Sequence, residues 1–160
     1  MATDPSPTPT ADDTATPNGG EPPAKEPYIG AVGIGVSDLK RSIDFFTQLG
    51  FTFNPQFTDD SATCMLLSDE AFVMLLVEPR FSDFVTKQIC DTTTHTEVIM
   101  CVSADSRDEV DVLVHKALAA GGKPSNDPID HGFMYGWSFQ DPDGHLWEVM
   151  YMDPSGMPEQ

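Results

Sequence analysis

One carboxylate lies inside a strongly apolar segment near the end of the chain: Glu148, in the run HLWEVMYMD. A carboxylate surrounded by apolar side chains can serve as a general base or acid. The hydroxyl of Tyr135, in the preceding run FMYGWSF, could polarise a substrate carbonyl beside it. The same carboxylate could instead only pair with the Tyr135 hydroxyl or with the indole N–H of Trp137. We therefore take Glu148 and Tyr135 as candidate catalytic residues and Trp137 as a candidate ligand contact.

The positions of these side chains depend on a predicted β-hairpin. FMYGWSF and HLWEVMYMD flank the turn Asp141–Gly144, and both runs read as strands. A four-residue turn places Trp137 opposite Glu148, and it places Tyr135 opposite Met150. Since side chains alternate across a strand, all four are expected on one face of the sheet.

The composition excludes several classes of function. The chain has 26 acidic and 8 basic residues, for a net charge of −18, and it has no basic patch. Binding to phosphate backbones or anionic membranes needs clustered Lys and Arg, so we expect neither nucleic acid nor membrane as a partner. There is no nucleophile elbow, P-loop or dinucleotide fingerprint, since GAVGIG lies within a predicted strand.

The cysteines and the apolar runs suggest a compartment. Cys64, Cys90 and Cys101 are odd in number and form no CxxC pair. No signal-like segment follows Met1, and no apolar run is long enough to span a bilayer. These features favour a reducing, cytoplasmic setting.

The elements that must position Glu148 form two similar units of α+β type. Residues 1–27 are acidic, rich in Pro and Thr, and lack large apolar side chains, so we predict a disordered tail there. A strand, a helix and three strands follow in 28–79, then a linker in 80–94. The same order returns in 95–153, where Ser106 and Glu109 form a capping box, and 154–160 is a C-terminal tail.

The repeated order, the phrase VSDLKRSIDFFTQLGF and the closing DPDGHLWEV together resemble the vicinal oxygen chelate superfamily. This superfamily includes glyoxalase I, bleomycin-resistance proteins and extradiol dioxygenases. The chain is most similar to the branch labelled predicted lactoylglutathione lyases. The resemblance covers residues 28–153 and implies one curved, mixed eight-stranded sheet around a cavity, with the helices outside. It also implies a homodimer, since relatives usually pair.

The resemblance implies a divalent metal held by one side chain from each of four strands. With Glu148 as anchor, strand alternation and the repeat put Ala31, Met74 and Ile99 at the other three positions. Ala and Ile offer no lone pair, and a thioether suits soft metals, so we expect no metal cofactor. A divalent metal at a shifted site of His95, Glu97 and Glu148 is the alternative, although His95 fits a loop.

The same reasoning predicts an apolar, thioether-rich cavity that binds a small molecule. His131 is expected near its mouth. The predicted contacts are Met65, Phe72, Met74, Trp137, Met150 and His131.

Three functions remain open from the sequence. One is metal-free binding of a small apolar or aromatic molecule, as in drug-sequestering proteins. Another is a lyase, isomerase or dioxygenase-type enzyme that uses Glu148 in an atypical metal site or as a general acid or base. The third is a partner-binding dimer in which the cavity is vestigial.

Overall fold

The computed structural model describes residues 26–156. Residues 1–25 of the predicted tail and 157–160 at the C-terminus lie outside the described residues. Within the described part, no helix has the length and apolar character needed to cross a membrane.

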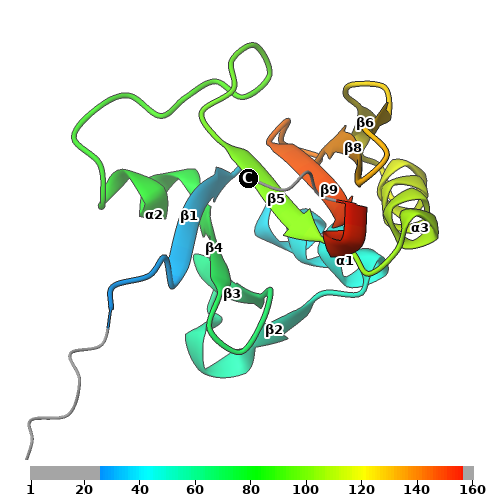
Figure 1. Cartoon of the computed structure of the whole chain (residues 1–160). Coiled ribbons are helices and arrows are strands. Elements are labelled where there is room, and N and C mark those ends of the chain that lie inside the picture. The colour runs from blue at the N-terminus through cyan, green and yellow to red at the C-terminus, as the bar shows by residue number, and fades with distance from the viewer. Residues whose placement is uncertain (1–25, 157–160) are drawn as a thin grey trace, which may run out of the picture.

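The first module is a four-stranded mixed sheet with one long helix (Figure 1). Helix α1 begins where the Asp38 side chain accepts the Arg41 N–H, and it ends at Gly50, which has a φ of 101°. The strand order is β1-β4-β3-β2, in which β1 and β4 are parallel. Its elements are β1 (Ala31–Val36), α1 (Leu39–Leu49), β2 (Thr52–Asn54), the 3₁₀ turn η1 (Pro55–Phe57), β3 (Ala62–Leu66) and β4 (Phe72–Val77).

A short helix, α2 (Glu78–Ser82), opens the connection to the second module, and irregular chain follows it. The second module repeats the first, and its helix α3 is capped by Ser106, whose side chain accepts the Glu109 N–H. The Glu109 carboxylate accepts the Asp105 N–H in return, so the predicted capping box is confirmed. The elements are β5 (Ile99–Ser103), α3 (Arg107–Ala119), β6 (Lys123–Pro124), β7 (Ile129–Asp130), β8 (Met134–Gln140), β9 (Leu146–Met152) and the 3₁₀ turn η2 (Pro154–Gly156).

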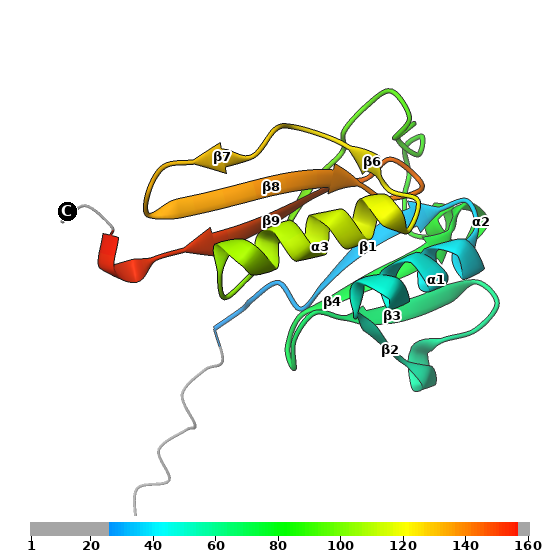
Figure 2. The same ribbon diagram turned by 90° about the vertical axis from the view of Figure 1, so that its right-hand side faces the viewer.

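The predicted α+β class is confirmed, but the single eight-stranded sheet is not. The second module has its own five-stranded sheet, in the order β5-β9-β8-β6 with β7 also paired to β8. No ladder joins the two sheets among residues 26–156. Figure 2 shows α1 and α3 next to each other on one side of both sheets.

One hydrophobic core lies between these helices and the inner faces of both sheets. Aromatic side chains of α1 cross from the first module into the second: the ring centroid of Phe46 is 5.0 Å from that of Trp147, and Phe45 is 6.1 Å from Phe139. Burying each such ring stabilises the fold by about 1.5–3 kcal/mol. Helix α1 therefore packs against the second module as well as its own.

Candidate functional site

The turn of the β8–β9 hairpin is one residue longer than the sequence predicts, because Gln140 pairs with Leu146 and residues 141–145 lie between them. The Asp141 N–H donates to the carbonyl of His145, and the Gly144 N–H donates back to Asp141. Gly144 adopts a φ of 91°, which is the left-handed conformation that closes such short loops. Ser138 therefore pairs with Glu148, and the register differs by one residue from the prediction.

This shift moves both aromatic side chains to the opposite face. Tyr135 lies on the helix side, where its hydroxyl donates to Asp111 of α3 at 2.7 Å, and this hydrogen bond raises the pKa of Tyr135. Trp137 packs edge-on against His115, with ring centroids 5.1 Å apart. The predicted placement of Tyr135 and Trp137 beside Glu148 is wrong, because a one-residue slip reverses every side chain.

Met65, a predicted cavity contact in the β3–β4 hairpin, also lies on the opposite face of its sheet from the predicted one. Met65 pairs with Val73 and is fully buried in the core, so its predicted cavity position is wrong. Cys64 takes the place next to Met74. Phe72 and Met74 lie on the outer face of the sheet, away from the helices, and both are half-buried.

Glu148 also lies on the face away from the helices, paired in register with Cys101 of β5. Burial raises the pKa of the Cys101 thiol, and the nearby Glu148 carboxylate raises it further. A cavity of about 40 Å³ adjoins Glu148, Met150 and Ser138. This volume holds about two or three waters and is far below that of a typical ligand pocket.

The residues present do not fit the divalent metal that the resemblance implies. Of the four positions, only Glu148 carries a hard donor, and Ile99 is an exposed hydrophobic side chain. The shifted set is not brought together either: His95 Nδ1 shares a hydrogen bond with the Thr94 hydroxyl at 2.7 Å, and Glu97 contacts His145. Among residues 26–156, no three His, Cys, Asp or Glu side chains are grouped to hold a metal ion.

His131 is exposed in the connection between β7 and β8, where its N–H donates to the Met134 carbonyl at 2.8 Å. No other sequence-predicted contact shares a hydrogen bond with it. Its predicted role at a cavity mouth stays a prediction.

A buried polar cluster that the sequence analysis did not identify joins the two modules. His145 is 3% exposed, and it contacts the Glu97 carboxylate through Nδ1 and the Gly35 carbonyl of β1 through Nε2, at 2.7 Å. Two residues earlier, the Asp143 carboxylate accepts from the Ser37 hydroxyl at 2.6 Å and from Arg41 at 2.9 Å. We call this loop, Asp141–His145, the clasp loop.

The partners of His145 fix its charge. A carbonyl and a carboxylate oxygen only accept hydrogen bonds, so both ring nitrogens must donate, which makes the ring an imidazolium. Burial opposes that charge, but the Asp141 carboxylate, the Gly35 carbonyl and the Glu97 carboxylate outweigh it and raise the pKa of His145. Burial likewise raises the pKa of Asp141, which accepts the Trp147 indole N–H at 3.2 Å. The sequence signal for this cluster is the motif DPDGH, in which Asp141, Asp143 and His145 surround one turn.

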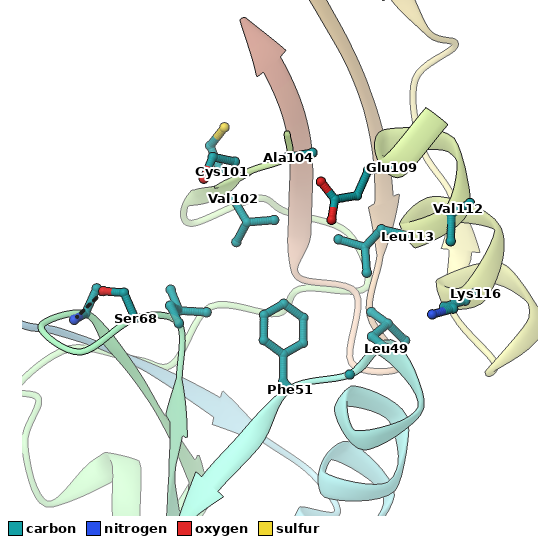
Figure 3. A pocket seen from close by; sticks show the side chains of 14 residues that line it. Leu49, Phe51, Ser68, Cys101, Val102, Ala104, Glu109, Val112, Leu113 and Lys116 are labelled. Atoms are coloured by element: carbon teal, nitrogen blue, oxygen red, sulfur yellow. Dashed lines mark hydrogen bonds between the residues drawn. The ribbon is translucent and has the colours of Figure 1, made fainter. Parts of the chain in front are cut away.

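A hollow lies at the seam between the modules, and we call it the inter-module groove. Its volume is about 480 Å³, within the range of small-molecule sites. Figure 3 shows Phe51, Val102 and Leu113 directed into the same space from different elements. The groove is lined by Leu49, Gly50, Phe51, Leu67, Ser68, Ala71, Cys101, Val102, Ser103, Ala104, Glu109, Val112, Leu113 and Lys116.

Comparison with solved structures supports the architecture. A hypothetical protein of S. aureus is 29% identical, with a TM-score of 0.63 over 74% of this chain and 89% of that chain. A glyoxalase/bleomycin resistance protein/dioxygenase family enzyme of Burkholderia phytofirmans is 16% identical, with a TM-score of 0.65 over 77% of this chain and 97% of that chain. A lactoylglutathione lyase of Agrobacterium tumefaciens is 15% identical, with a TM-score of 0.61 over 84% and 100%.

Curated proteins give no match. The family model described as Glyoxalase/Bleomycin resistance protein/Dioxygenase superfamily matches residues 28–149, which is most of the chain. With the doubled module and this match, the chain belongs to the glyoxalase/bleomycin resistance protein/dioxygenase superfamily.

Proposed function

We propose that the protein binds a small apolar or aromatic molecule in the inter-module groove, without the four-ligand metal site of its superfamily. One observation carries this proposal: the groove encloses about 480 Å³, whereas the cavity beside Glu148 encloses about 40 Å³. A ligand of ordinary size buries most of its surface only in the larger space.

The lining of the groove supports an apolar ligand. Phe51 comes from the first module, and Val102 and Leu113 come from the second, so a bound molecule would contact both. The side chains at the seam are only partly buried, because the two sheets do not join there. Covering this exposed apolar surface gives the driving force for binding, about 25 cal/mol per Å².

Binding of N-phenyl-1-naphthylamine, a neutral aromatic whose fluorescence rises in apolar surroundings, tests the proposal. We expect saturable binding to the wild type with one site per chain. Ala71→Phe places a ring in the groove and should lower the affinity for the probe at least tenfold. Ala119→Phe adds the same ring on an exposed part of α3 outside the groove and should leave binding unchanged. Equal affinity of all three proteins would refute the groove as the site.

A second candidate function rests on Glu148. Among residues 26–156 its carboxylate has no hydrogen-bond or ion-pair partner, which leaves it available for proton transfer to a substrate on the outer face. In a lactoylglutathione lyase assay with and without added divalent metal, this candidate requires turnover that Glu148→Gln abolishes. Turnover that survives the substitution removes it.

A further inference from the structure

Lys116 stands out in a strongly acidic protein. The chain has 26 acidic and 8 basic residues, and four of the basic ones are held by carboxylates in ion pairs: Lys40, Arg41, Arg80 and Arg107. Lys116 makes no ion pair within residues 26–156, yet it lines the inter-module groove. In Figure 3 its nitrogen points toward the groove, beside Leu49. A groove cation without a protein partner is available to an anionic group of a ligand.

The face of α3 that lines the groove carries one charge at each end. Glu109, Val112, Leu113 and Lys116 follow one another at spacings of three, one and three residues, which puts them on one side of a helix. Seven residues separate Glu109 from Lys116, a rise of about 10 Å along the axis. The two charged ends thus bracket an apolar stretch formed by Val112 and Leu113.

Two other polar side chains of the groove, Glu109 and Ser68, already share hydrogen bonds with the backbone. The Glu109 carboxylate already accepts the Asp105 N–H at 2.5 Å, in the first turn of α3, where the helix dipole favours its negative charge. On the facing wall, the Ser68 oxygen accepts the N–H groups of Glu70 and Ala71 at 3.3 Å and 3.1 Å. The hydroxyl proton of Ser68 therefore remains free to donate to a ligand.

We infer that the groove selects an apolar molecule with a single carboxylate, which lies against Lys116 while the apolar body lies over Phe51, Val112 and Leu113. This inference rests on the proposed function and adds its ligand class. A second carboxylate at the far end would meet Glu109, so a dicarboxylate binds more weakly. A ligand amine would be repelled by Lys116 if it took the carboxylate's place.

Titration with three naphthalene probes of equal shape tests this selection: 2-naphthoate, 2-naphthalenemethanol and 2-naphthylmethylamine. At low salt we expect wild-type protein to bind the carboxylate about fivefold more tightly than the alcohol, the scale of one partly exposed ion pair. The preference for the carboxylate over the alcohol should shrink at about 0.5 M salt, because salt screens such ion pairs. An alcohol or amine that binds as tightly as the carboxylate overturns the inference.

Substitution of the lysine separates this inference from the proposed function. Lys116→Met should remove the preference for 2-naphthoate and keep the affinity for the alcohol. Lys123→Met, which removes an exposed lysine of β6 outside the groove, should keep the preference. If Lys116→Met retains the preference, the carboxylate inference fails while alcohol binding still supports the groove. If the wild type binds neither probe, the proposed function itself fails.

Glu109 gives an independent readout. We expect 2,6-naphthalenedicarboxylate to bind the wild type more weakly than 2-naphthoate, and Glu109→Gln to narrow this difference at least twofold. Gln keeps the reciprocal cap possible, because its amide oxygen can still accept the Asp105 N–H. An unchanged difference in the variant would overturn the assignment of Glu109 to the far end of the ligand.

Discussion

The two β-hairpins occupy equivalent places in their modules, yet their loops do different work. The β3–β4 loop contributes Leu67, Ser68 and Ala71 to the wall of the inter-module groove. The β8–β9 loop is the clasp loop, whose Asp143 and His145 bind the first module. The β3–β4 loop leaves a groove between the modules. The β8–β9 loop instead joins the modules directly, through hydrogen bonds to Ser37 and Gly35. The comparison teaches that the same supersecondary unit can hold two modules together in one place and leave a groove between them in another.

The largest expected effect is at the turn of the clasp loop. Gly144 has a φ of 91°, and a Cβ there would collide with the Thr92 carbonyl oxygen. Gly144→Ala should therefore lower the free energy of unfolding by about 3 kcal/mol or more, since it adds a backbone clash to left-handed strain. Gly50→Ala is the matched control, because Gly50 has a φ of 101° but open space around it. Gly50→Ala should lower the free energy of unfolding by only about 1 kcal/mol. Urea denaturation of both variants measures the two costs. Equal costs would contradict the close approach at Thr92.

The buried charge of the clasp loop should have the next largest effect. His145→Gln keeps a polar side chain but leaves Glu97 and Asp141 without the cation between them. The free energy of unfolding should fall by roughly 3 kcal/mol, as for other broken buried pairs. Chemical denaturation measures the loss. A cost below about 1 kcal/mol would show that the interaction does not join the modules.

The pH dependence of stability should distinguish the clasp loop from the groove loop. The pKa of His145 is raised from 6.5, so its stabilising effect is fully present below about pH 6.5 and is lost as the pH rises through the folded-state pKa. The slope is at most about 1.4 kcal/mol per pH unit for one group. His145→Gln should remove this slope, whereas Ala71→Phe in the groove loop should keep it. An unchanged slope in the His145 variant would rule out the imidazolium.

The smallest expected effect concerns Ser68 in the groove loop. Ser68→Ala removes a hydroxyl that accepts two backbone N–H groups and lies on the groove wall. Because the site is exposed, stability should fall by about 0.5–1 kcal/mol. Affinity for 2-naphthoate should fall about twofold, with the affinity for 2-naphthalenemethanol less affected. An equal loss for both probes would place the hydroxyl away from the carboxylate.

The sequence predicted the helices and strands better than it predicted which face of a sheet each side chain occupies. Local signals suffice for α1, because Asp is a common helix N-cap residue and Gly commonly ends a helix, and Asp38 and Gly50 take these two positions in the structure. The face of Tyr135 depended on the length of one loop, and one residue of error reversed it. A turn sequence such as DPDG is compatible with either length, so the register came from the structure alone.

The candidate site was less predictable than the fold for a physical reason. The groove forms where α1, α3, β5 and the β3–β4 loop meet, and no local pattern reports such a meeting. His145 is similar: its contact with Gly35 spans 110 residues of sequence. Glu148, in contrast, stands out in the sequence as a lone carboxylate among apolar neighbours, but the cavity beside it is small, and its role in a site stays a prediction.

Methyl NMR spectra during titration with 2-naphthoate test the central claim most directly, since methyl groups line both candidate sites. The groove presents the methyls of Leu49, Leu67 and Leu113, whereas the cavity beside Glu148 presents those of Met134 and Met150. We predict saturable shifts of the three leucine signals, with the two methionine signals unchanged. Shifts confined to the methionine signals would contradict the claim and return the ligand to Glu148.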